Sequence, residues 1–176
     1  MIEKTLIKAD KLFVGDVCYC LRDDIYRGIW GDEYNYADGI IKDEDDTVIS
    51  VIGSTAYGDG SYTSDNGIEY SVDAGVIGVS NLEYSDETYV TLEKLGTVVD
   101  VPSGKAAVFF ECDEGDFFIK IIDVDSEEIL YDDVIPTKSE SAEEEYGWYE
   151  DDEEYDYFKN DDDDDYDDEE DGDEDY

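Results

Sequence analysis

The chain of 176 residues contains no histidine, only 11 basic residues, three cysteines and two prolines. Without histidine it lacks the side chain that most often serves as a general acid or base near neutral pH. No run of 18 apolar residues is present, and the opening MIEKTLIKADK lacks the apolar stretch of a signal peptide. We therefore expect a soluble intracellular protein with no membrane partner.

The three cysteines are Cys18, Cys20 and Cys112. Cys18 and Cys20 would share one face of a strand, where a disulfide between them would be strained. With no histidine and no second C-x-C pair, the chain also lacks the usual ligands of a zinc site. We expect buried or partly buried reduced thiols, no metal and no cofactor.

Negative charge dominates what is present. The chain has 54 acidic residues and a formal net charge of -43. The excess is shared by both parts of the chain, with -22 in residues 139–176 and -21 in residues 1–138. Such a field repels nucleic acids and anionic membranes, and attracts basic surfaces over about 8–10 Å at physiological salt. This charge argues against direct nucleic-acid binding and favours a basic protein partner.

Residues 1–138 have the alternating patterns of β-strands. The segments that predict strands are KLFVGDVCYCL (11–21), TVISVIG (47–53), IEYSVD (68–73), VIGVS (76–80), TVVDV (97–101), AAVFFECD (106–113) and DFFIKIIDVD (116–125). Within IEYSVD, the residues Ile68, Tyr70 and Val72 should face inward. Asn66-Gly67 before it predicts a type I′ hairpin turn, and DEG predicts the hairpin between the last two strands.

Two segments predict short helices, DDIYRGIWG (23–31) and SDETYVTLEKLG (85–96). Ser85 is placed to cap the second helix, and Gly96 to end it. The strands lie too close in sequence for βαβ crossovers. We expect a mainly β protein, α+β at most. Its six to nine strands would form a compact antiparallel sheet folded into a small barrel or sandwich, with one or two short helices.

The composition changes abruptly near Lys138. Beyond it the chain has few aliphatic residues and no apolar period, so burial cannot offset the entropy of ordering it. The sequence predicts an acidic globular domain at residues 1–138. An acidic, aromatic-containing disordered tail would follow at residues 139–176.

The segment TAYGDGSYTSDNGIEYSVDAG (55–75) contains the most distinctive motif. Its candidate site residues are Tyr57, Asp59, Tyr62 and Asp73. Asp59 and Asp73 would form a hard-cation site or an acid–base pair if they converged in a pocket, but Gly-Asp-Gly is also a common turn. No candidate nucleophile lies beside a base, so we favour structural turns and predict that the protein is not an enzyme.

Three of these segments, FVGDVCYCL, YNYADG and TAYGDGSYTSDNGIEYSVDAGVIGVS, resemble a group of small uncharacterised bacterial and phage proteins. The pattern of that group has a Gly-Asp-Pro-Cys-Tyr strand, a Tyr-Gly-Asp-Gly-x-Tyr turn and a Val-Asp-x-Gly strand end. The resemblance covers about residues 12–80, and Val17 stands where the pattern has proline. It implies a compact β-rich domain from a bacterium or its phage, and no particular activity. Because we also expect an intracellular protein, the expected location is the cytoplasm of a bacterial host cell.

The tail has the charge spacing of a nucleic-acid strand. Successive residues of an extended chain lie roughly 3.3–3.6 Å apart, and phosphates of one strand lie about 3.4 Å apart. Its aromatic side chains would add contact area on a partner. The predicted partner-binding residues are Trp148, Tyr149, Asp151, Asp152, Tyr155, Asp156, Tyr157, Phe158, Asp161, Asp162, Asp163, Asp164, Asp165, Tyr166, Asp167 and Asp168.

These features favour a non-enzymatic inhibitor that mimics nucleic acid, encoded by a phage or mobile element. It would occupy the basic cleft of a host defence nuclease or another nucleic-acid-binding protein. The alternative is a protein-binding or immunity-type module whose tail only keeps it soluble. A surface adapted to high salt is a further alternative.

Overall fold

The computed structural model describes residues 3–29 and 39–138. The strands of this part are β1 (Glu3–Lys8), β2 (Lys11–Asp16), β3 (Gly39–Lys42), β4 (Val48–Ser54), β5 (Gly60–Thr63), β6 (Glu69–Val72), β7 (Val76–Asn81), β8 (Thr97–Asp100), β9 (Lys105–Asp113), β10 (Asp116–Asp123) and β11 (Ile129–Ile135). Its helices are α1 (Val17–Cys20), α2 (Asp23–Ile29), α3 (Tyr89–Leu92) and the 3-10 helix η1 (Leu82–Tyr84).

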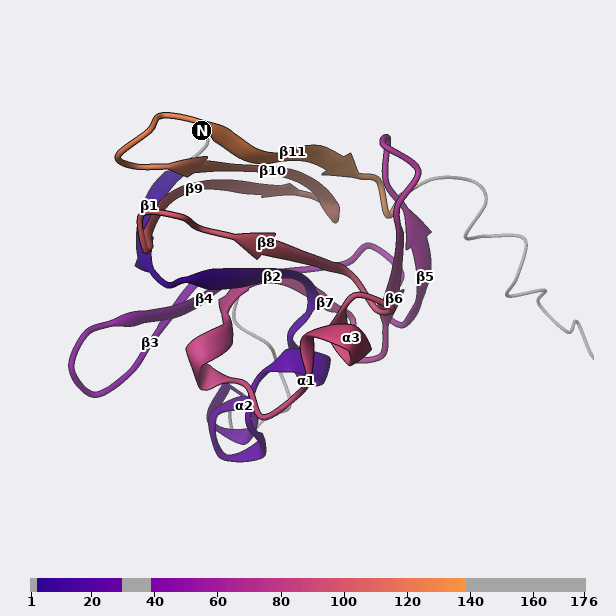
Figure 1. Cartoon of the computed structure of the whole chain (residues 1–176). Helices are drawn as coiled ribbons and strands as arrows, with labels where there is room; N and C mark the ends of the chain where they lie inside the picture. Colours follow the sequence, from indigo (N-terminus) through magenta and orange to yellow (C-terminus); the bar gives the residue numbers. More distant parts are fainter. Residues whose placement is uncertain (1–2, 30–38, 139–176) are drawn as a thin grey trace, which may run out of the picture.

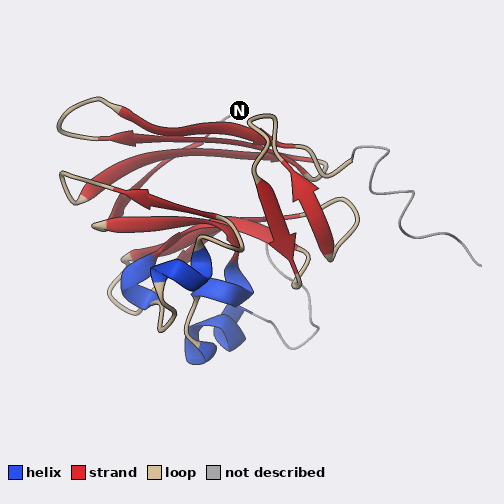
Figure 2. Ribbon diagram, turned by 45° about the vertical axis from the view of Figure 1, so that its right-hand side comes forward, coloured by secondary structure: helices blue, strands red, loops and turns tan. Residues whose placement is uncertain are grey.

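Two antiparallel sheets face each other as a sandwich (Figure 1). Sheet A has the strand order β1-β9-β10-β11, and sheet B has the order β3-β4-β7-β2-β8. The β5–β6 hairpin stands at one side of the sandwich, and the helices lie against the face of sheet B that points away from sheet A (Figure 2). The mainly β, antiparallel fold is confirmed, and it is a sandwich.

Sheet B is buried on both faces, so the protein has two apolar cores. Leu12 and Val14 of β2 point into the core between the sheets. Phe13, between them in sequence, points into the core under the helices, together with Leu92 of α3. Burial on both faces explains why all six residues of β7 are buried.

The predicted strand at residues 11–21 is wrong beyond Asp16. The chain turns into helix α1 at Val17, because the Asp16 side chain accepts a hydrogen bond from the Cys18 amide at 2.9 Å and caps the helix. Val17, Cys20 and Leu21 are buried, which is the i, i+3, i+4 spacing of a helix. Cys18 and Cys20 therefore do not share a strand face.

Three predicted local details are also wrong. In the β5–β6 hairpin the Gly67 amide donates to the Ser64 carbonyl at 2.8 Å, so Asp65 and Asn66 are the central residues of the turn. Only Gly67 of the Asn-Gly pair has a positive φ, 80°, which excludes a type I′ turn at these two residues. The loop has five residues, because the register pairs Thr63 with Glu69.

The cap of α3 is Thr88 in place of Ser85, whose hydroxyl accepts from the Glu87 amide at 3.1 Å before the helix begins. The predicted end of this helix at Gly96 is wrong as well, because α3 ends at Leu92 with Glu93 as its C-cap. The Gly96 amide donates to the Leu92 carbonyl at 3.0 Å in the turn that follows the helix. The inward positions of Tyr70 and Val72 and the DEG hairpin between β9 and β10 are confirmed.

Asp123 joins the β10–β11 loop to the turn before β9. One carboxylate oxygen accepts from the Asp125 and Ser126 amides at 3.1 and 3.0 Å, and the other from the Ser103 amide at 2.9 Å. These donors hold the pKa of Asp123 well below its usual value. The carboxylate therefore stabilises the fold when it is ionised.

We expect the stabilisation from Asp123 to disappear in acid. Because the pKa is lowered in the folded state, the contribution is complete above the unfolded pKa of about 3.9 and falls as the pH drops below it. In urea unfolding, the difference between wild type and Asp123→Asn should therefore shrink from pH 6 towards about pH 2. Asp125→Asn, at an exposed position of the same loop, is the control. A difference that stays constant across this range would contradict the prediction.

Candidate functional site

The structure brings the two motif turns together. The Thr55 hydroxyl donates to the carbonyls of Gly58 at 2.7 Å and Gly75 at 3.2 Å. A side chain on Gly75 would meet the Gly58 Cα at 3.2 Å, so the turns are in direct backbone contact. The turn that carries Asp59 and the turn that follows Asp73 therefore lie at the same end of the sandwich, beside the β5–β6 hairpin.

Asp16 lies beneath these turns and is fully buried. Its second oxygen accepts from the Asp73 and Ala74 amides, each at 2.7 Å, while the first caps α1 at Cys18. Burial raises the pKa of Asp16, and the amide donors oppose that rise. Sequence reasoning did not select Asp16 as important, although an Asp between an apolar strand and a turn is a capping signal.

The two motif tyrosines have different environments. Tyr62 is buried and donates its hydroxyl to the Gly58 carbonyl at 2.9 Å, so it holds the Gly-Asp-Gly turn closed. Tyr57 is 46% exposed and offers its ring to solvent. Asp59 and Asp73 are exposed at the turns. Burial raises the pKa of the neighbouring Tyr19, and the negative charges of Asp73 and Asp59 raise it further.

The side chains at this end of the sandwich offer few groups for metal binding or nucleophilic catalysis. Within residues 3–29 and 39–138, no group of three or more cysteine or acidic side chains is arranged to hold a metal ion. Cys18 and Cys20 are free thiols, and burial raises the pKa of Cys20 to about 12 and that of Cys18 further. Both thiols are therefore protonated at neutral pH and are weak nucleophiles.

Away from the motif turns, a hollow of about 780 Å³ lies between α2, the β3–β4 turn and η1. Tyr84 donates to Asp43 at 2.6 Å, and the other oxygen of Asp43 accepts from the Asp45 and Thr47 amides at 2.9 and 2.8 Å. These bonds lower the pKa of Asp43 and raise that of Tyr84 to about 12. The acidic turn 43–46 is thus held in one conformation at the rim of the hollow.

The bases near this hollow are already paired. Arg22 lies 3.5 Å from Asp24, and Lys42 lies 2.7 Å from Asp46. Asp43, Glu44 and Asp45 also line the hollow, so carboxylates outnumber the bases there. The hollow is therefore an acidic surface with a tyrosine in its wall.

The predicted partner-binding residues of the tail, from Trp148 to Asp168, lie outside the described residues. In the described part, no helix is long and apolar enough to cross a membrane. No protein-family model, no curated protein and no solved structure matches this chain.

Proposed function

We propose that the protein is a non-enzymatic inhibitor that presents clustered carboxylates to the basic nucleic-acid-binding surface of another protein, such as a host defence nuclease. The observation that carries the proposal is the charge of -21 on residues 1–138, which is almost equal to that of the tail. A solubilising tail alone would not require a folded domain of that charge.

The described surface supports the proposal by where its carboxylates lie. Acidic residues gather at turns, where they are exposed to a partner: residues 43–46, Asp113 and Glu114 between β9 and β10, and residues 125–128 between β10 and β11. The six ion pairs within the described residues leave most carboxylates there uncompensated. Lysines and arginines of a partner groove would neutralise these carboxylates.

The test is affinity capture with the full-length tagged chain from a bacterial lysate, with salt as the variable. Captured proteins should be basic and should bind nucleic acid, and a DNA or RNA duplex should compete with this protein for each of them. Affinity should fall steeply as salt rises, as it does when charge dominates binding. Partners that are neutral or acidic, and whose binding is insensitive to salt, would contradict the proposal.

Variants of the acidic turn locate the contact surface. Glu44→Gln with Asp45→Asn removes two carboxylates of the exposed turn and keeps Asp43, whose hydrogen bonds hold it. We expect weaker binding and a shallower salt dependence, because fewer charges are neutralised in the complex. Glu127→Gln with Glu128→Gln makes the same change of charge at the β10–β11 turn and serves as the comparison. Equal losses of affinity in both double variants would indicate that the partner responds to the overall negative charge of the domain and not to a defined contact surface.

Removal of residues 139–176 separates the proposal from its alternative. If a partner were bound by the domain alone and with unchanged affinity, the tail would be a solubiliser. The protein would then be a binding module of the immunity type. Under the proposal, the truncated chain should bind the same partners more weakly, because about half of the negative charge is gone.

A further inference from the structure

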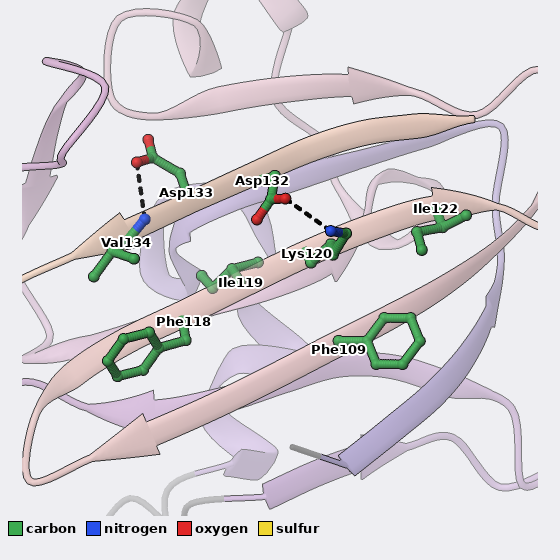
Figure 3. Close-up of a pocket in the computed structure, with 8 residues that line it drawn as sticks. All are labelled: Phe109, Phe118, Ile119, Lys120, Ile122, Asp132, Asp133 and Val134. Carbon is green, nitrogen blue, oxygen red and sulfur yellow. Dashed lines mark hydrogen bonds and ion pairs between the residues drawn. The ribbon is translucent and has the colours of Figure 1, made fainter. Parts of the chain in front are cut away.

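The outer face of sheet A is apolar at its centre and is not covered by other described elements. A hollow of about 650 Å³ lies over β9, β10 and β11, with Phe109, Phe118, Ile122 and Val134 around it (Figure 3). Phe118 is 41% exposed, and Leu6 on the neighbouring β1 is 46% exposed. Sheet B carries helices on its outer face, whereas this face of sheet A carries none of the described helices (Figure 2).

One half of this face gathers lysines, against the sign of the protein. The registers place Lys4 beside Phe109, Phe109 beside Lys120, and Lys8 beside Lys105. Alternation along the strands sends all four lysines outward, to the half of the face where Asp132 is the acid among the described strand residues. By the same alternation Glu111, Asp113 and Asp116 lie on the other half, toward the β9–β10 hairpin. Four of the ten bases in residues 1–138 therefore gather on one sheet face.

The pairing of Lys120 leaves the other lysines available. Lys120 lies 2.8 Å from Asp132 across the hollow (Figure 3). Within the described ranges, no ion pair includes Lys4, Lys8 or Lys105. An apolar hollow beside unpaired lysines fits a ligand that has both aromatic rings and carboxylates.

We propose that this face binds the chain's own segment 146–158, YGWYEDDEEYDYF. The segment combines six aromatic side chains with six acidic ones and no base, and its charge is opposite to that of the lysines. Trp148 and Tyr149 would enter the hollow, and the acids that follow them would lie over the lysines. The inference stands apart from the proposed function, since it concerns a contact within one chain.

The chain is long enough for this contact. Val134 lines the hollow, and β11, the edge strand of sheet A, ends at Ile135, three residues before Lys138. The ten residues from Lys138 to Trp148 span at most about 33–36 Å, and a strand of eight residues is only about 27 Å long. Covalent attachment also gives the segment an effective concentration of about millimolar at the face.

A second copy of the chain is a poorer occupant. Two copies of sheet A facing each other would oppose lysines to lysines, and the rest of each molecule is strongly negative. The chain's own acidic segment supplies the complementary charge and does not oppose lysines to lysines. In its bound state the segment would withhold its rings and carboxylates from any other partner.

Trp148 reports this contact in the full chain. In a Trp30→Phe background, Trp148 is the single tryptophan, and its quenching by neutral acrylamide measures its exposure. We expect strong protection at low salt, lost in high salt. Phe118→Ser and the double variant Lys4→Glu with Lys8→Glu should each raise the quenching constant severalfold, towards that of a free tryptophan amide.

The matched controls lie on α3 and in the turn that follows it. Val90→Ser changes another exposed apolar residue, 67% exposed, and Lys94→Glu changes another exposed lysine. Both should leave Trp148 protected. Full quenching of Trp148 in the parent chain would overturn the proposal. Equal changes of the quenching constant in the sheet A variants and the control variants would overturn it as well. Protection that disappears on dilution would also overturn it, since the occupant would then be the tail of a second copy.

Discussion

Replacement of Asp16 by alanine is expected to lower the free energy of unfolding by about 3 kcal/mol or more, because three backbone amides lose their acceptor, a fully buried carboxylate. These amides belong to Cys18, Asp73 and Ala74, at distances of 2.9, 2.7 and 2.7 Å. Each hydrogen bond to a charged group contributes about 1.5–3 kcal/mol, and desolvation of the buried carboxylate offsets part of their sum. Urea unfolding at neutral pH measures the loss.

Two further substitutions show that the loss comes from the acceptor. Asp16→Asn keeps the size of the side chain but replaces one acceptor oxygen by an NH2 group that faces donors, so it should also destabilise the protein. Asp73→Ala should have little effect, because its side chain is exposed and only its backbone amide contacts Asp16. An Asp16→Ala protein within about 1 kcal/mol of wild type would contradict this account of the site.

Replacement of Phe13 by alanine is expected to cost about 3–5 kcal/mol, because its ring is fully buried in the core beneath the helices. Two glycines make room for the ring. A side chain built at Gly15 would lie 2.6 Å from a ring carbon, and one at Gly96 would lie 2.8 Å from the same carbon. Such close enclosure leaves little freedom for neighbours to fill the cavity.

The elements that open first in Phe13→Ala distinguish the two cores. Amide hydrogen exchange in Phe13→Ala should increase first in α1 and α3, which pack on this core, before the strands of sheet A open. Phe118→Ala, at a partly exposed position on the outer face of sheet A, is the control and should change stability little. Equal destabilisation by both substitutions would contradict the two-core description.

The central strands were predictable from the sequence because they bury long apolar runs. β4, β7, β9 and β10 all fall within segments that alternate or are continuously apolar. The strands that the pattern did not indicate are β1, β3, β5 and β11. Three of them are sheet edges and the fourth is part of the separate hairpin, so their pairing partners define them more than their own residues do. They also explain why the described part has more strands than the six to nine predicted.

The helix at residues 17–20 shows the limit of periodicity. Four residues with alternating apolar side chains fit a strand, and they fit one helical turn as well. Asp16 decides between these structures, because its carboxylate accepts a hydrogen bond from the Asp73 amide in the turn after β6, 57 residues away. A contact between residues so distant in sequence is not visible in a local pattern.

The sequence by itself determined the charge of both parts of the chain, the mainly β class and the scarcity of catalytic side chains. Only the tertiary structure decided where the charges lie. Lys4, Lys8, Lys105 and Lys120 come from three strands, and they share one face because antiparallel register and two-residue alternation bring them together. A strand register is set by pairing between distant segments, so a strongly acidic chain can gather lysines on one sheet face in a way that no single segment reveals.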